Sequence, residues 1–233
     1  MASAQFVIFD FDGTLFDTHR AISHSIKLTF DSLLPTSAPA EFEIQKLIGR
    51  GWGLKDVLNV LHPSPDSFDQ DEWTSTYRRI YNDEGQSLVS PFDGAKKLLK
   101  TLYARNISIA IVSNKGVAAV ETALKNNGMD GIIPKDFIIG DNTPWATRKP
   151  DPGSYFNVLV PALSARGFSK DIDVSKILVV GDTEADRQFA FNIGGARSVW
   201  CRYGYGDKAT CEKLAPDFTI NSLDEVEGLV DRV

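Results

Sequence analysis

Short apolar runs, rich in β-branched and aromatic residues, alternate with amphipathic stretches along most of this chain. The apolar runs lie at Phe6–Phe9, Ile107–Val112, Phe137–Ile139, Ile177–Val180 and Ser198–Cys201. Each is short enough to be a strand that is buried on both faces. The amphipathic stretches predict helices at Ala95–Ala104, Val117–Asn126, Tyr155–Ala165 and Ala185–Ile193. This β-α-β-α order predicts an α/β fold with a parallel, doubly wound sheet, whose site lies beyond the carboxyl ends of the strands.

The segment from residue 18 to residue 89 breaks this alternation. It has no run typical of a buried strand, but it has helical stretches at Ala21–Leu33, Leu54–Leu61 and Glu72–Glu84. The turn-like sequence of residues 90–94 marks the return to the alternating pattern. We therefore predict an inserted α-helical domain at 18–89 and a core formed by residues 1–17 and 90–233. A closing helix is expected at Ser222–Val233, with Ser222 and Glu225 as a capping box.

The composition limits the classes of protein that the chain can represent. Its formal charge of −6 and pI near 5.1 lack the basic footprint of a general nucleic-acid binder. No apolar run is long enough for a membrane span, and the N-terminus has no signal-peptide pattern. We therefore expect a cytoplasmic monomer or homodimer that binds neither nucleic acid nor membrane. Its two cysteines, Cys201 and Cys211, are expected to be free thiols.

Acidic side chains follow the first and fourth predicted strands. Asp10 and Asp12 come directly after Phe6–Phe9, and residues two apart on an extended backbone project the same way. Asp182 and Asp186 follow Ile177–Val180, where both could face one site across the first helical turn. Two structural explanations compete with a catalytic one. Asp-Gly is a common turn signal, and acids at a helix N-terminus cap the helix and interact favourably with its dipole.

These carboxylates would meet at one edge of a parallel sheet, where they need a cation. Two like charges about 4 Å apart repel by roughly 4 kcal/mol at an effective dielectric constant of 20. Hard carboxylate oxygens with no nearby His or Cys favour Mg²⁺ over zinc, and partly hydrated Mg²⁺ commonly accompanies a phosphoryl group. The sequence therefore predicts a magnesium site at this edge.

Two further strand ends offer groups that could bind phosphate. Ser113-Asn114-Lys115-Gly116 follows Ile107–Val112 and supplies a hydroxyl, an amide and a helix N-terminus. Lys149 precedes a predicted helix and could pair with both a phosphate and a carboxylate. Ser113 could instead be a plain helix cap, and Lys149 a solvated loop lysine.

These four elements, in this order, resemble the haloacid dehalogenase-like (HAD) hydrolase superfamily. The family's motifs stand here as Asp10–Thr14, as Ser113, as Lys149, and as Asp182 with Asp186. The resemblance implies a Rossmann-like core with an inserted helical C1-type cap. Within the superfamily, Ser113-Asn114-Lys115, Lys149-Pro150 and Tyr203-Gly204-Tyr205-Gly206 look most like phosphoglycolate phosphatases.

The resemblance also implies roles for individual residues. Asp10 would be the nucleophile that forms an aspartyl-phosphate, and Asp12 the general acid and base. Mg²⁺ would be held by Asp10, Asp12 through its carbonyl, Asp182 and Asp186. Ser113 and Lys149 would stabilise the phosphoryl charge, while Thr14 and Asn114 would bind substrate. The expected activity is hydrolysis of a small-molecule phosphate ester, such as a phosphoglycolate-like or sugar phosphate.

Several related activities share parts of this pattern. A haloacid dehalogenase lacks the second aspartate, so Asp12 argues against that chemistry. A phosphonoacetaldehyde hydrolase needs a cap lysine, for which Lys55 is the candidate, and normally has a small residue where Asp12 stands. A phosphomutase and a phosphatase for a lipophilic, isoprenoid-like phosphate remain open alternatives. A non-enzymatic binding protein would be expected to lack Asp10 or Asp12.

The substrate would be chosen by the inserted segment. Residues 47–53, Leu-Ile-Gly-Arg-Gly-Trp-Gly, look like a flexible loop that faces the site. Arg50 could meet an anionic group of the substrate and Trp52 an apolar one. A surface arginine in a glycine-rich turn is the alternative explanation for Arg50.

Overall fold

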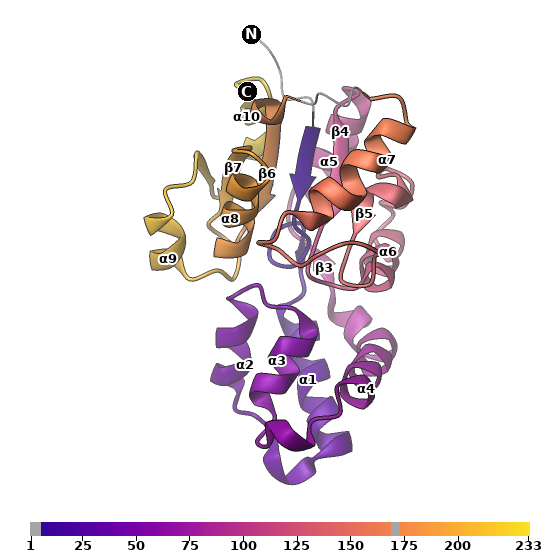
Figure 1. Ribbon diagram of the computed structural model, residues 1–233. Helices are drawn as coiled ribbons and strands as arrows, with labels where there is room; N and C mark the ends of the chain where they lie inside the picture. Colours follow the sequence, from indigo (N-terminus) through magenta and orange to yellow (C-terminus); the bar gives the residue numbers. More distant parts are fainter. Residues whose placement is uncertain (1–5, 169–172) are drawn as a thin grey trace.

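A six-stranded parallel sheet forms the centre of the protein (Figure 1). The computed structural model describes residues 6–168 and 173–233, so residues 1–5 and 169–172 of the predicted core lie outside the described residues. The strand order is β5-β4-β1-β6-β7-β8. The strands are β1 (Phe6–Phe9), β4 (Ser108–Val112), β5 (Ile138–Ile139), β6 (Ile177–Gly181), β7 (Arg197–Cys201) and β8 (Phe218–Ile220). All four residues of β1 are buried, as expected for a central strand with both faces covered.

Helices cover both faces of this sheet, which confirms the doubly wound α/β prediction. In Figure 1, α7 and α8 lie in front of the strands and α5 lies behind them. In α5 the buried residues are Ala95, Leu98, Leu99 and Leu102, the spacing of an amphipathic helix. The core helices are α5 (Ala95–Ala104), α6 (Val117–Asn126), α7 (Val160–Ala165), α8 (Glu184–Asn192), α9 (Lys208–Lys213) and α10 (Val226–Val230).

Four further helices lie beyond the carboxyl ends of the strands, and we call them the cap (Figure 1). They are α1 (His19–Leu33), α2 (Glu41–Ile48), α3 (Leu54–Leu61) and α4 (Gln70–Asp83). The chain enters the cap after β2 (Phe16–Asp17) and returns through β3 (Ser90–Pro91), which pairs with β2 in antiparallel fashion. Apolar contacts such as Phe30 with Trp73, whose ring centroids lie 4.6 Å apart, hold the cap helices together.

Some elements differ from the sequence-based expectation. The helix predicted at Tyr155–Ala165 is divided into a π-helical segment, Ser154–Leu159, and α7. Pro161 explains this, because it has no N–H to donate to the preceding turn. The closing helix is also shorter than predicted: a 3₁₀ turn at Leu223–Glu225 precedes α10, although the capping box of Ser222 and Glu225 is confirmed.

Two expectations on cysteines and membrane spans can be compared directly with the structure. Cys201 and Cys211 are both buried free thiols, as predicted. Within residues 6–168 and 173–233, none of the helices has the length and apolar character that crossing a bilayer requires.

Candidate active site

Three neighbouring strands end in polar residues at the same edge of the sheet. Asp10 follows β1, Ser113 follows β4 and Asp182 follows β6. The parallel register pairs Phe9 with Ile111 on one side and with Val180 on the other, so Asp10 lies between the other two strand ends. Its backbone N–H donates to the Val180 carbonyl at 2.8 Å, which extends the ladder to the first residue of the site.

Three buried carboxylates gather at this edge. Asp10, Asp182 and Asp186 each present one oxygen, and these oxygens all lie within 4.8 Å of one another. Lys149 lies against two of the three, because its Nζ is 2.6 Å from an oxygen of Asp10 and 2.6 Å from an oxygen of Asp186. The structure thus brings together four residues that the sequence nominated from three separate segments.

The pKa values of these groups reflect burial and crowding. Burial raises the pKa of the Asp10 carboxyl to about 7, although Lys149 acts in the opposite direction. Burial, with the charges of Asp10 and Asp186, also holds the pKa of Asp182 well above its ordinary value. Burial by itself lowers the pKa of Lys149, but Asp10 and Asp186 outweigh it and raise that pKa above its usual range.

The donor set suits a divalent metal ion. Three carboxylates share one ammonium group, so the ionised cluster lacks positive charge. A metal ion among the carboxylates supplies that charge, and hard oxygen ligands are those that Mg²⁺ and similar ions take. The cluster can therefore hold a metal ion, as the acidic residues of the sequence predicted.

Glycines and one backbone N–H enclose Asp182. A Cβ on Gly13, whose φ is +77°, would lie 2.3 Å from an oxygen of Asp182, and a Cβ on Gly204 would lie 2.2 Å from the Asp182 Cβ. The backbone N–H of Tyr205 donates to Asp182 at 2.6 Å. The sequence Tyr203-Gly204-Tyr205-Gly206 supports the family resemblance but does not by itself predict a contact with Asp182. Its glycines are the signal that a chain passes close to another group here.

Thr14 supports the same carboxylate. Its side chain is fully buried, and its hydroxyl donates to Asp182 Oδ1 at 3.3 Å. It does not line the cavity described below. The structure therefore places Thr14 behind the acidic cluster, whereas the sequence suggested that it binds substrate.

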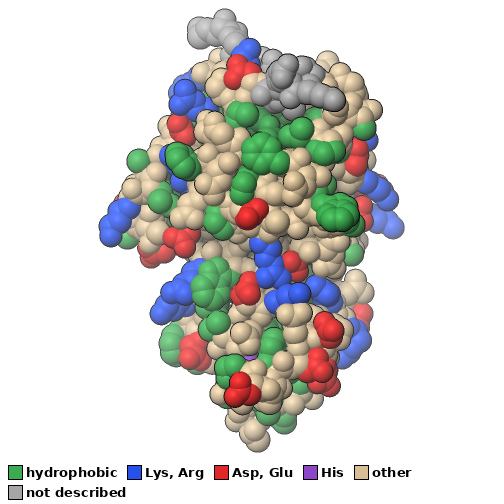
Figure 2. Space-filling view, viewed as in Figure 1, with side chains coloured by type: hydrophobic (Ala, Val, Ile, Leu, Met, Phe, Trp, Pro, Cys, Tyr) green, Lys and Arg blue, Asp and Glu red, His purple; other side chains and the backbone are tan. Residues whose placement is uncertain are grey.

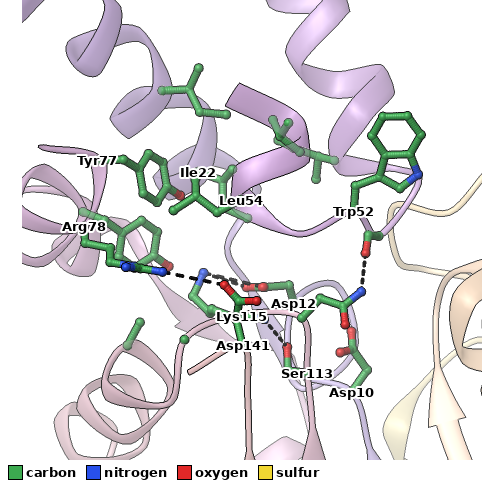
Figure 3. Close-up of a pocket in the computed structure, with 18 of the residues that line it drawn as sticks. Asp10, Asp12, Ile22, Trp52, Leu54, Tyr77, Arg78, Ser113, Lys115 and Asp141 are labelled. Atoms are coloured by element: carbon green, nitrogen blue, oxygen red, sulfur yellow. Dashed lines mark hydrogen bonds and ion pairs between the residues drawn. The ribbon is translucent and has the colours of Figure 1, made fainter. Parts of the chain in front are cut away.

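Asp12 lies apart from the three clustered acids. It accepts a hydrogen bond from the Thr18 hydroxyl at 2.6 Å, and Lys115 Nζ lies 3.1 Å from the same oxygen. Ser113 is buried nearby, and its Oγ accepts from the Lys115 N–H at 3.3 Å. Asp12, Ser113 and Lys115 all line one cavity, together with Asp10 and Lys149 (Figure 3).

Asn114 joins the core to the cap. Its Nδ2 donates to the carbonyl of Gly51 in the cap at 2.8 Å, and its Oδ1 accepts from the Lys149 N–H at 2.8 Å. Both ends of the amide are thus used by backbone groups. The sequence nominated Asn114 for substrate binding, and the structure gives it a positioning contact to the loop that holds Lys149.

Ion pairs also cross from core to cap. Arg148 donates to Asp141 at 2.6 Å and to Asp56 of α3 at 2.6 Å. Arg78 of α4 lies 3.6 Å from Asp141. Figure 2 shows blue and red side chains gathered at the waist between cap and core. The sequence did not reveal the two pairs that cross between core and cap, Arg148 with Asp56 and Arg78 with Asp141, because their partners are separated by tens of residues.

The cap loop places its two candidate specificity residues differently. Trp52 lines the cavity between cap and core and is 40% exposed. Arg50 does not line that cavity, and its guanidinium lies 5.0 Å from the centre of the Trp52 ring. Trp52 is therefore at the cavity, while Arg50 lies against its ring and outside the cavity lining.

A cavity of about 210 Å³ lies between the acidic edge of the sheet and the cap (Figure 3). Asp10, Asp12, Ser113 and Lys149 line it from the core, and side chains of all four cap helices line it from the opposite side. Fold and site together define a class of protein: α/β enzymes that act at the carboxyl edge of a parallel sheet, beneath helices inserted after the first strand.

Comparison with known proteins identifies the family. The family model described as haloacid dehalogenase-like hydrolase matches residues 7–199. The chain belongs to this family, which confirms the resemblance and makes the protein a hydrolase. It is 26% identical to a pyrophosphatase PpaX of Halalkalibacterium halodurans, with 96% of this chain and 95% of the relative covered. It is 30% identical to a phosphoglycolate phosphatase of Cereibacter sphaeroides, with 85% of each covered.

Solved structures share the fold. A haloacid dehalogenase-like family hydrolase from Streptococcus pneumoniae superposes with a TM-score of 0.78 at 24% identity, covering 98% of this chain and 99% of that chain. The likeness extends over the cap as well as the core.

Proposed function

We propose that this protein is a magnesium-dependent phosphatase that hydrolyses a small-molecule phosphate ester through an aspartyl-phosphate on Asp10. The observation that carries the proposal is the buried group of Asp10, Asp182 and Asp186, with Lys149 hydrogen-bonded to two of them. Asp10 and Lys149 of this group line a cavity beneath the cap. Its relatives named phosphoglycolate phosphatase and pyrophosphatase agree with phosphate chemistry.

Each residue has a task in this proposal. Asp10 attacks phosphorus while Lys149 holds its carboxylate in place and neutralises charge on the phosphoryl oxygens. Ser113, at the adjacent strand end, donates to one of those oxygens. Asp12 protonates the departing alkoxide and then removes a proton from the attacking water.

The metal site belongs to Asp10, Asp182 and Asp186, with the Asp12 carbonyl as a further oxygen. Mg²⁺ bound there would supply positive charge to the phosphoryl group. Thr14 and the Tyr205 N–H fix Asp182, so its orientation does not depend on the ligand. We further propose that residues 18–89 act as a lid that excludes water and sets substrate choice.

Asp10→Asn tests the nucleophile. We expect loss of at least about 10³-fold in kcat with the fold intact, because an amide cannot form the phosphoenzyme. Asp10→Asn should also trap no acid-stable phosphate label from a ³²P-labelled substrate, whereas the wild type does. Turnover within tenfold of wild type, in a preparation free of other phosphatases, would refute the assignment.

Metal removal tests the magnesium dependence that we propose. Activity should vanish in EDTA and return with Mg²⁺, and Asp182→Ala should raise the Mg²⁺ concentration needed for half-maximal activity far more than Ser113→Ala does. A phosphatase transfers the phosphoryl group to water and releases inorganic phosphate, whereas a phosphomutase transfers it to an alcohol or sugar. Measuring both products distinguishes the two. Full activity in chelator would show that the acidic cluster does not hold a catalytic metal.

A further inference from the structure

The cap side of the cavity is a wall of aliphatic side chains. Ile22 and Ile26 of α1, Ile48 of α2, and Leu54 and Val57 of α3 all line it. Two tyrosines of α4, Tyr77 and Tyr81, complete the wall, and Figure 3 shows Tyr77, Ile22 and Leu54 facing the labelled acids across the cavity. A ligand that extends from the acidic edge therefore meets apolar surface.

The cations that line this cavity are already paired. Lys149 lies 2.6 Å from Asp10, Lys115 lies 3.1 Å from Asp12, and Arg78 lies 3.6 Å from Asp141. No other Lys or Arg of the described residues lines it. Lys149 and the proposed metal ion suffice for one phosphoryl group. A second anionic group on the substrate would have to take a cation away from its carboxylate.

Apart from the paired Arg78 of α4, the polar groups that the cap side of the cavity offers are neutral. Among the described residues, the Tyr81 hydroxyl and Gln86 Oε1 are buried without a hydrogen-bond partner, and both residues line the cavity. The amide of Gln86 has a fixed orientation, because its Nε2 donates to the Ala119 carbonyl at 3.0 Å. Both atoms are closed to solvent, so a ligand meets them only if the side chain rotates, which for Gln86 breaks its hydrogen bond to Ala119. They suit a hydroxyl of the ligand and give no charge to a carboxylate.

The cavity size limits the ligand as well. An apolar protein cavity of about 150 Å³ holds benzene. The cavity here is about 210 Å³, and it includes the space over the acidic edge. Beside a phosphoryl group, this space suits an organic group of about one six-membered ring.

We propose that the substrate is a phosphate monoester of a compact, uncharged and largely apolar alcohol, and that α1, α3 and α4 select it against esters with a second anionic group. This inference rests on the proposed phosphatase function and narrows it. The expected substrate therefore differs from phosphoglycolate, which carries a carboxylate, and from pyrophosphate, which carries a second phosphate.

Three matched esters test the proposal with the full chain and Mg²⁺. Benzyl, 4-(hydroxymethyl)benzyl and 4-carboxybenzyl phosphate share a leaving group of nearly equal acidity, and the last two are close in size. We expect kcat/KM for each neutral ester to exceed that for the carboxylated ester by at least tenfold. Phosphoglycolate and pyrophosphate should fall at or below the carboxylated ester. Acetyl phosphate, which is activated and small, reports on the core chemistry.

A variant pair on α3 tests the wall itself. Val57 is 5% exposed and lines the cavity, whereas Val60, one turn on, is 56% exposed and does not. Val57→Thr keeps the shape and adds a hydroxyl, so the ratio of kcat/KM for benzyl phosphate to that for acetyl phosphate should fall about fivefold or more. Val60→Thr should leave this ratio unchanged.

The outcomes separate the two proposals. The inference is overturned if the enzyme hydrolyses acetyl phosphate but prefers 4-carboxybenzyl phosphate, phosphoglycolate or pyrophosphate to the neutral esters. The phosphatase proposal stands in that case. An equal ratio in Val57→Thr and Val60→Thr also overturns the inference. If neither acetyl phosphate nor any of the esters is hydrolysed, the phosphatase proposal is overturned, and the inference with it.

Discussion

Thr14 provides a sharp test of how the metal site is built. Its hydroxyl is the one described donor to Asp182 Oδ1, at 3.3 Å in a fully buried position, while the other oxygen is held by the Tyr205 N–H at 2.6 Å. Thr14→Val has nearly the same shape and removes only this donor. We expect a loss of about 1.5 kcal/mol in the free energy of unfolding, at the low end for a hydrogen bond to a charged group because the bond is long.

Thr14→Ser is the matched control, because it keeps the hydroxyl and removes the methyl group. Losing one buried methyl costs about 1 kcal/mol, so stability alone hardly separates the two variants. Metal binding does separate them. Loosening Asp182 should weaken Mg²⁺ affinity about tenfold or more in Thr14→Val, and Thr14→Ser should bind Mg²⁺ like the wild type.

Urea unfolding with and without Mg²⁺ measures the change in Mg²⁺ affinity without an activity assay. A tenfold weaker Kd lowers the stabilisation by a saturating Mg²⁺ concentration by about 1.4 kcal/mol. Substrate KM should not change in either variant at saturating Mg²⁺, because Thr14 does not line the cavity. A raised KM with unchanged Mg²⁺ affinity would refute this reasoning and return Thr14 to substrate binding.

Three further predictions concern the acid, the cap contact and pH. Asp12→Asn should slow turnover of alkyl phosphates more than of aryl phosphates with good leaving groups, and equal losses in kcat would exclude Asp12 as the leaving-group acid. Asn114→Ala should lose about 1–3 kcal/mol of stability and speed amide hydrogen exchange in the loop around Gly51; unchanged exchange would deny the cap contact. Burial raises the pKa of Asp217, but hydrogen bonds from Ser198 and Arg197 outweigh it and hold that pKa below its ordinary value. Its stabilisation is therefore present above about pH 4 and lost as pH falls through the lower folded-state pKa, so Asp217→Asn should cost about 1–2 kcal/mol at pH 7 and progressively less as the pH falls below about 4. A cost in urea unfolding that does not decrease on acidification would contradict this.

The sequence predicted the sheet well wherever a strand is fully buried. β1, β4 and β6 are continuous apolar runs, and their ends fix where Asp10, Ser113 and Asp182 stand. The sequence pattern does not predict β8, because Phe218–Ile220 is three residues long and only Ile220 is buried. The cap helix α2 was also missed between the nearby prolines, although Ile44, Leu47 and Ile48 have helical spacing.

The acidic cluster and Lys149 could be nominated from the sequence, but the contacts of the other candidate residues could not. A motif places Thr14 and Asn114 near the strand ends, yet it does not say which way each side chain turns. Thr14 turns towards Asp182, and Asn114 towards Gly51 and the backbone of Lys149. Such orientations depend on segments far along the chain, which local pattern does not encode.

If the substrate is the neutral ester that we propose, cap position and substrate choice have a common physical origin. The pair of Arg78 with Asp141 crosses from cap to core, and the same Arg78 is one of the cations lining the cavity. Arg148 makes the reverse crossing to Asp56. A substrate carboxylate that captured Arg78 would therefore weaken a contact that holds the cap over the site, and it would leave Asp141 with one partner fewer. A neutral substrate leaves both crossings in place. The same two ion pairs would then favour an uncharged organic group on the substrate and hold the cap over the site. Their residues lie away from the proposed position of the phosphoryl group.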